Sequence, residues 1–371
     1  MNKLGIYIHI PFCNAKCSYC DFVSSVCGDD VKAAYFSRLR SDILEFASSG
    51  KAQDKTVDSI YFGGGTPTSV AEKYIAQIMD LLRSGFNVAS DCETTIEANP
   101  ESLTSIKAEC YASSGINRIS IGLQSATDSL LSEIGRIHTV YDFIKAADIA
   151  QSRFNNVSAD LMLALPGQTV RDVEKAINLL AGRQFNHISA YSLKVEEGTP
   201  LFSTGYQPEE DYAADLYSLT RSMLEQYGYK GYEVSNFALP GYECRHNMRY
   251  WMRGEYLGFG VAAHSFYDNE RYCMTSDLKA YLSGEGITEK TFIQPDGEEA
   301  AEETAMLALR TSYGLDLEKY RQTFGRDLLK DRGELIEELT ESGYVEINNG
   351  KLTLTDKGLY VMNEIIVRFV L

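Results

Sequence analysis

Three cysteines near the start of the chain are the residues best suited to metal chemistry. Cys13, Cys17 and Cys20 form a CxxxCxxC pattern directly after a short apolar run. One tight loop can therefore present three thiolates to a single centre, and thiolates suit both iron–sulfur clusters and zinc. A structural zinc site would need a fourth ligand at short spacing, and neither His9 nor Cys27 has a usual one. The pattern favours a four-iron cluster with one iron left free, which the amine and carboxylate of an amino acid can chelate.

Composition and charge limit the partners and the compartment. The chain has 371 residues, 44% of them hydrophobic, and a formal net charge of −17. Such a balance disfavours nucleic acid as the main partner, because a nucleic-acid surface must neutralise phosphates. No apolar run approaches the length of a membrane span, and the first residues do not resemble a signal peptide. We therefore expect a cytoplasmic protein without a membrane span, in which clustered cysteines bind metal instead of forming disulfides.

The elements that must position the cysteines form a repeated pattern over the first 200 residues. Short runs rich in Ile, Val and Tyr predict strands at 4–10, 57–62, 93–98, 117–123, 157–165 and 187–193. Helical periodicity lies between them, for example at 31–47, 72–83 and 171–182. This alternation predicts an α/β fold with a parallel sheet, in the form of an incomplete (β/α)6 TIM-like barrel. Functional residues are then expected at the carboxyl ends of the strands.

Two further regions follow this core, which we assign to residues 1–205. Residues 206–284 begin with a helix at 208–228 and continue as an irregular, aromatic-rich extension, and 284–299 is typical of a linker. Residues 285–371 predict helices at 298–311, 315–323 and 329–341, followed by a hairpin whose turn contains Asn349 and Gly350. We expect a small winged-helix-like α+β domain there. Its acidic residues outnumber its basic ones, so protein contact is favoured over nucleic-acid binding.

The cysteine segment CNAKCSYC and the glycine-rich segment DSIYFGGGTPT (58–68) together resemble the radical S-adenosylmethionine (SAM) superfamily. Further segments at strand ends extend the match to the oxygen-independent coproporphyrinogen III oxidase-like subgroup: TIEANP, ISIGLQS, IGRIH and ADLMLALPGQT. The resemblance implies a 4Fe-4S cluster on the three cysteines and a bound SAM. The residues that it implies around SAM are Tyr7, Tyr19, Gly64, Gly65, Thr66, Glu97, Gln124, Arg136 and Asp160.

Two branches of this subgroup differ in function. The oxidases carry another cysteine two residues after the third ligand, and an extension before the cluster, whereas here Cys20 is followed by Asp21 and Phe22. Residues 246–251 read HNMRYW and match the HNxxYW motif of the heme-chaperone branch. This similarity favours a chaperone that binds heme and delivers it to a recipient protein. The alternative is a coproporphyrinogen dehydrogenase of porphyrin biosynthesis, so whether the protein is an enzyme stays open here.

The heme ligand has two candidates. His246 opens the motif in a region rich in tyrosines and beside Trp251, and neutral imidazole is a common ligand of heme iron. The other interpretation of His246 is a role at the SAM site or in packing. His264 is the second candidate.

The resemblance also implies a further partner, a flavodoxin- or ferredoxin-like electron donor. Besides the heme chaperone and the dehydrogenase, a third class of protein is a zinc-stabilised nucleic-acid-binding protein, which the charge and the SAM-site matches disfavour.

Overall fold

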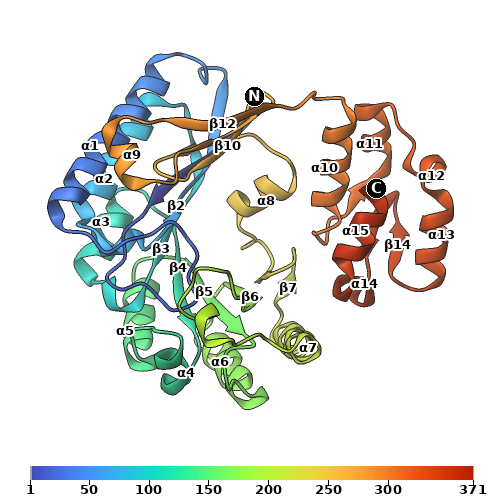
Figure 1. Cartoon of the computed structure of the whole chain (residues 1–371), viewed down its shortest axis with the longest axis horizontal. Helices are drawn as coiled ribbons and strands as arrows, with labels where there is room; N and C mark the ends of the chain where they lie inside the picture. The colour runs from blue at the N-terminus through green and yellow to red at the C-terminus, as the bar shows by residue number, and fades with distance from the viewer. Residues whose placement is uncertain (1, 371) are drawn as a thin grey trace.

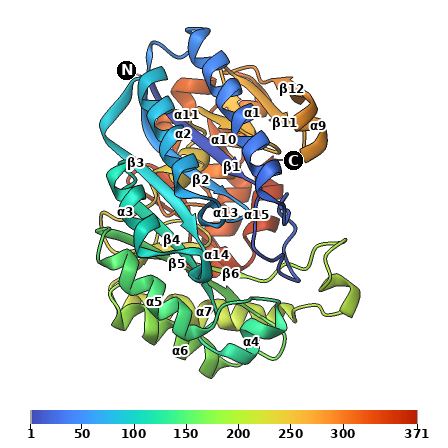
Figure 2. The same cartoon turned by 90° about the vertical axis from the view of Figure 1, so that its left-hand side faces the viewer.

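Six parallel strands alternate with helices, which confirms the predicted fold class. The computed structural model describes residues 2–370. The strands are β1 (Asn2–Ile10), β2 (Lys55–Gly64), β3 (Val88–Ala98), β4 (Arg118–Gln124), β5 (Asn156–Leu163) and β6 (His187–Ser192), and they pair in chain order. The connecting helices are α1 (Asp29–Ser48), α2 (Glu72–Gly85), α3 (Ser105–Ser113), α4 (Asp128–Glu133), α5 (Val140–Gln151) and α6 (Val170–Gly182). Figure 2 shows these helices along one side of the curved sheet.

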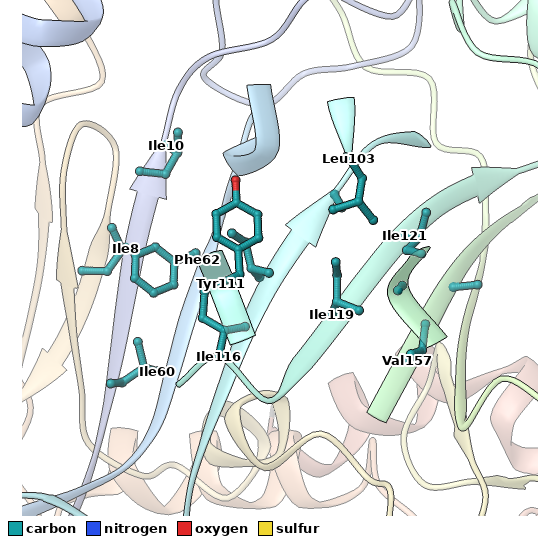
Figure 3. Packing of buried hydrophobic residues seen from close by; sticks show 14 of the residues in the cluster. Ile8, Ile10, Ile60, Phe62, Leu103, Tyr111, Ile116, Ile119, Ile121 and Val157 are labelled. Carbon is teal, nitrogen blue, oxygen red and sulfur yellow. The ribbon is translucent and has the colours of Figure 1, made fainter. Parts of the chain in front are cut away.

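The two faces of the sheet differ in polarity because side chains alternate along each strand. The face toward the helices is apolar, and Ile8, Ile60 and Ile119 are fully buried there (Figure 3). The opposite, concave face carries polar residues at the intervening positions, such as Tyr61 and Ser120. A sheet that only needed a core would be apolar on both faces. The concave face is therefore where the chemistry of this protein must lie.

Local capping signals fix where two of the helices begin. At the start of α5, Thr139 Oγ1 accepts a hydrogen bond from the Asp142 backbone N–H at 3.2 Å, and the Asp142 carboxylate accepts one from the Thr139 N–H at 2.9 Å. Thr169 and Asp172 repeat this return bond at the start of α6, also at 2.9 Å. Each reciprocal pair satisfies backbone donors that a helix end leaves free. These caps fix where the connection from β4 to α5 and the connection from β5 to α6 end.

The region after β6 is more regular than the sequence indicated. It contains α7 (Glu210–Gln226), β7 (Lys230–Gly231), β8 (Asn236–Ala238), α8 (Arg245–Trp251), β9 (Tyr256–Phe259), β10 (His264–Tyr267), β11 (Glu270–Met274), α9 (Leu278–Ser283) and β12 (Ile287–Phe292). The prediction that the chain is irregular after the helix at 208–228 was wrong, because β8 pairs with β6 and β9 pairs in parallel with β1. The predicted linker 284–299 was wrong in part, because β12 pairs with β11. Twelve strands form one sheet in the order β12-β11-β10-β9-β1-β2-β3-β4-β5-β6-β8-β7.

The last part of the chain forms a small α+β unit with its own apolar core, at the right of Figure 1. Its elements are α10 (Glu298–Ala308), β13 (Leu315–Asp316), α11 (Leu317–Phe324), α12 (Leu328–Asp331), α13 (Gly333–Glu341), β14 (Val345–Asn348), β15 (Lys351–Leu354), α14 (Asp356–Tyr360) and α15 (Met362–Val370). The predicted hairpin is present: Asn349 and Gly350 both have positive φ, 52° and 76°, as a tight primed turn requires. Among the helices described for residues 2–370, none combines the length and apolar character of a membrane span.

Candidate cluster and cofactor site

A cavity of about 320 Å³ lies where the parallel strands end. It brings together most of the residues that the sequence nominated, from segments spread over the first half of the chain: Cys13, Cys17, Tyr19, Cys20, Gly64, Gly65, Thr66, Glu97, Gln124, Arg136 and Asp160. The carboxyl end of a β/α sheet is the usual position of a site in such folds. Tyr7 and His246 are not part of the lining described for residues 2–370.

The cysteine loop is held in place by backbone hydrogen bonds. Cys13 N–H donates to Ser25 O at 3.1 Å, and Ser18 links the loop to the segment after α4 by donating to Ile134 O at 3.1 Å. The glycine-rich turn closes over the loop, with Thr66 N–H donating to Phe12 O at 2.7 Å. A Cβ on Gly65 would lie 2.8 Å from Phe12 O, closer than real Cβ contacts allow. Gly65 is therefore required for the turn to pack on the cysteine loop.

The three thiols sit in one partly buried environment. Burial raises the pKa of Cys13 and of Cys20, and the hydrogen bond between Cys13 Sγ and Thr66 Oγ1, at 3.5 Å, opposes this rise at Cys13. Arg136 Nη1 lies 3.6 Å from Cys17 Sγ, so a cation stands beside the thiols. Within residues 2–370, no three His, Cys, Asp or Glu side chains are close enough to hold a single metal ion. A four-iron cluster takes one thiolate per iron, and three thiols around one cavity fit that donor set.

Asn99 links three parts of the site and was missed by the sequence analysis. Its Nδ2 donates to Thr66 Oγ1 at 3.0 Å, and its Oδ1 accepts a hydrogen bond from Arg136 Nη2 at 2.8 Å. Arg136 also donates to Gly122 O at 3.2 Å. The network fixes a guanidinium at the cavity wall, where it can bind a carboxylate. The available signal was position, because Asn99 directly follows the end of β3.

Two carboxylates form the acidic side of the cavity. Burial raises the pKa of Glu97 to about 7, while the Tyr61 hydroxyl, which donates to Glu97 Oε1 at 2.8 Å, opposes the rise. Burial also raises the pKa of Asp160, and Ser120 Oγ donates to Asp160 Oδ1 at 3.0 Å. A guanidinium on one wall and carboxylates on another match a ligand that carries both signs of charge, such as an amino acid.

Several other residues that line the cavity lie on strands that were predicted correctly, but they were not predicted as site residues. Tyr191 on β6 donates to Gln124 Oε1 at 3.3 Å, and Gln124 itself has a φ of 65°. Positive φ is uncommon for a residue with a side chain and is often found at functional sites. The lining residues that were missed include Tyr61, Asn99, Gly122, Ser189, Tyr191, Ser235, Asn236 and Asn247, and, beside the cysteines and Glu97, Ala15, Lys16, Phe22, Ser24 and Ala98.

The two histidine candidates differ in exposure. His246 is 1% exposed, with Nδ1 3.0 Å from Ser59 Oγ and Nε2 2.8 Å from the Tyr250 hydroxyl. Burial lowers its pKa to about 3, so the ring is neutral. This packing favours the role beside the SAM site over the role as heme ligand, which stays a prediction. His264 is exposed at the start of β10.

Tyr7 stacks behind the wall of the cavity. Its ring centroid is 6.2 Å from that of Tyr61, and its hydroxyl lies 3.1 Å from His9 Nδ1. Burial raises its pKa well above the usual value, so the phenol is uncharged at neutral pH. Tyr7 therefore supports a lining residue without lining the cavity itself.

A cysteine loop at the carboxyl edge of six β/α units defines a radical SAM protein. The family model described as "Radical SAM superfamily" matches residues 7–180, and the model "HemN C-terminal domain" matches residues 296–361. A solved structure titled "Coproporphyrinogen III oxidase (HemN) from Escherichia coli is a Radical SAM enzyme" superposes with a TM-score of 0.86, covering 99% of this chain and 90% of that chain at 23% identity. That likeness shows the shared fold.

Similarity in sequence is stronger to another group within the superfamily. A Bacillus subtilis protein named "Heme chaperone HemW" is 34% identical, with 98% of both chains covered. A Lactococcus lactis protein of the same name is 32% identical, covering 98% of this chain and 97% of that one. The Bos taurus "Radical S-adenosyl methionine domain-containing protein 1, mitochondrial" is 31% identical over 98% of this chain and 87% of its own length. The chain belongs to the HemW family of radical SAM proteins.

Proposed function

We propose that this protein is a heme chaperone, which binds heme beside a 4Fe-4S cluster and SAM and delivers it to a recipient protein. The observation that carries the proposal is the near full-length similarity, at 34% and 32% identity, to two proteins named as heme chaperones. The sequence features of that branch agree with it. Cys20 is followed by Asp21 and Phe22, and residues 246–251 keep the HNxxYW motif.

The cavity residues divide between the two cofactors that the superfamily implies. Cys13, Cys17 and Cys20 would hold the cluster, and Arg136 would bind the carboxylate of SAM while Glu97 faces its positive charge. When bound, a reduced cluster can supply an electron to the sulfonium of SAM. The polypeptide would bind and orient these groups through the cavity walls. Other predicted SAM contacts are Tyr19, Gly64, Gly65, Thr66, Gln124 and Asp160.

The proposal includes partners and a location. A flavodoxin- or ferredoxin-like protein would reduce the cluster, and the heme recipient would be a second protein in the cytoplasm. The competing function is oxygen-independent oxidation of coproporphyrinogen III, supported by the structural likeness to the Escherichia coli oxidase. At 23% identity that likeness extends to the fold and not to the substrate.

Heme titration and a coproporphyrinogen assay on the same anaerobically reconstituted protein separate the two functions. We expect heme to bind stoichiometrically with a defined Soret band, and coproporphyrinogen III to stay unchanged when SAM and a reductant are supplied. A heme-loaded sample should then lose its Soret absorbance to a heme-free acceptor protein. Consumption of coproporphyrinogen without heme binding would contradict the proposal and establish the oxidase.

A further inference from the structure

The HNxxYW motif forms the short helix α8, which lies on the concave side of the sheet in Figure 1. Glu93 on β3 holds its amino end, because the carboxylate accepts hydrogen bonds from the backbone N–H groups of Arg245 and His246, both at 3.1 Å. Glu93 stands four residues before Glu97 on the same strand, so the two side chains share a face. One strand thus anchors the motif and supplies a carboxylate of the cavity.

His246 is fixed in a single orientation. Ser59 on β2 and Tyr250, one turn later on α8, each take one of its two ring nitrogens, at 3.0 and 2.8 Å. Buried polar groups with both partners satisfied are costly to move. The imidazole ring of His246 is therefore a rigid surface on which a neighbouring side chain can pack.

That surface carries Tyr61, which belongs to the cavity wall. The rings of His246 and Tyr61 stack with centroids 5.2 Å apart and an interplanar angle of 27°. On the far side of the same tyrosine, the hydroxyl donates to Glu97 Oε1 at 2.8 Å. Ring stacking fixes the plane of Tyr61, and the plane fixes the direction in which its hydroxyl points.

We propose that His246 is a positioning residue for the SAM site: its ring holds Tyr61 so that the tyrosine hydroxyl keeps Glu97 oriented in the cavity. The role goes beyond heme handling, because it depends only on the contacts from α8 to the cavity. Asn247, the next residue of the motif, lines the same cavity and supports the connection. The motif is then part of the cofactor pocket.

The electrostatics of Glu97 give this role a measurable signature. The charged and titratable groups around its carboxylate are Tyr61, Asp160, Arg118, Tyr7, Tyr191 and Tyr250, and the backbone N–H of Gly64 also donates to it. Burial raises the pKa of Glu97 to about 7, and the Tyr61 hydrogen bond is the largest influence that lowers it. Loss of that bond should raise the pKa further, so that more of the carboxyl is protonated at neutral pH. Binding of the cationic SAM should then require a higher pH.

The test measures SAM affinity against pH by calorimetry on anaerobically reconstituted protein. Removing a hydrogen bond to a charged group typically changes binding by about tenfold. We therefore expect His246→Ala to bind SAM about tenfold more weakly at neutral pH, with its pH midpoint shifted upward and its iron and sulfide content unchanged. Tyr61→Phe should give the same shift, and the double variant should be no worse than either single change. Additive losses would contradict a shared pathway.

His187 offers a matched control. It is also buried, with Nδ1 2.7 Å from Ser158 Oγ and Nε2 2.8 Å from the Tyr232 hydroxyl, but it does not stack on Tyr61. His187→Ala should lower the melting temperature without moving the pH midpoint. The proposal is wrong if His187→Ala shifts the midpoint equally, or if folded His246→Ala binds SAM normally and loses only heme.

A further variant keeps the idea testable should His246→Ala fail to fold. His246→Phe retains a ring against Tyr61 while losing both hydrogen bonds. We expect it to keep more SAM affinity than His246→Ala, or, where the alanine variant cannot be made, to lie between wild type and Tyr61→Phe. SAM binding by His246→Phe that is weaker than that of Tyr61→Phe would overturn the role of ring stacking.

Discussion

Cys27 shows at the residue scale why cysteine count alone does not define a ligand set. It follows Cys20 by seven residues within the same loop, yet it is absent from the described cavity lining. Its Sγ lies 3.2 Å from Ser25 Oγ, and Ser25 also pairs through its backbone with Cys13. The loop therefore leaves Cys27 outside the described cavity lining, while the backbone of Ser25 holds Cys13 in place.

Alanine substitutions of the four cysteines should separate these roles. Cys13→Ala, Cys17→Ala and Cys20→Ala should each lose the cluster, because no other thiol in the described cavity can replace the missing ligand. Cys27→Ala is the matched control and should retain full iron and sulfide. Iron and sulfide analysis after anaerobic reconstitution checks both expectations, and full occupancy in any of the first three would refute the ligand assignment.

The glycine-rich turn shows what an element contributes beyond its individual residues. If the glycine-rich turn only bound SAM, Gly65→Val would weaken SAM binding and leave the cluster intact. The structure changes this expectation, because a Cβ at Gly65 meets Phe12 O and also lies 3.1 Å from Cys13 Sγ. The turn and the cysteine loop form one packed unit, so a side chain in the turn must displace the loop.

Gly65→Val should therefore lower cluster retention together with SAM affinity. Gly182→Ala, at the end of α6, is a suitable control, since no atom outside its neighbours lies within 4 Å of the added Cβ. That variant should keep both cofactors and be neutral or slightly more stable, because alanine favours helix by up to about 1 kcal/mol over glycine. Iron analysis measures cluster retention and calorimetry measures SAM affinity in both variants. An intact cluster in Gly65→Val would disprove the coupling between the glycine-rich turn and the cysteine loop.

The elements differ in how well the sequence predicted them, for physical reasons. The strands β1 to β6 are long, β-branched and bounded by turn residues, so local pattern defines them. β7 and β8 have two and three residues, too few for any periodicity; they exist because β6 offers backbone partners to β8, and β8 offers them in turn to β7. Asn99 and Tyr191 were missed because their roles depend on Arg136 and Gln124, which only the fold brings near them.

At the scale of the whole molecule, an ion-pair cluster ties the small C-terminal unit to the large sheet. Glu303 on α10 accepts hydrogen bonds from Arg253, at 2.6 Å, and from Arg271 on β11. Both guanidinium groups also lie over the ring of Phe266, at 4.8 and 4.6 Å from its centroid. Arg253 follows α8 by two residues, so the segment after the motif helix, strand β11 and the C-terminal unit meet at one carboxylate.

Glu303→Gln should loosen this junction. Removing the charge leaves two partly buried guanidinium groups without their counter-ion, at a cost of about 1–3 kcal/mol. We expect a lower melting temperature and faster proteolytic release of the C-terminal unit. Glu338→Gln, which breaks an exposed pair with Arg368 within that unit, should leave the melting temperature nearly unchanged, because solvent screens exposed ion pairs. Equal effects of the two variants would rule out a special role for the junction.

The pairing of β1 with β9 has a consequence for the order of events during synthesis. Tyr7 on β1 pairs with Gly258 on β9, which is translated about 250 residues later. Until then, one edge of β1, the strand that leads into the cysteine loop, has no hydrogen-bonding neighbour, and such edges invite pairing with other chains. Loading iron before translation ends would place the cluster on an unfinished sheet. The topology therefore favours cluster insertion as a late, post-translational step.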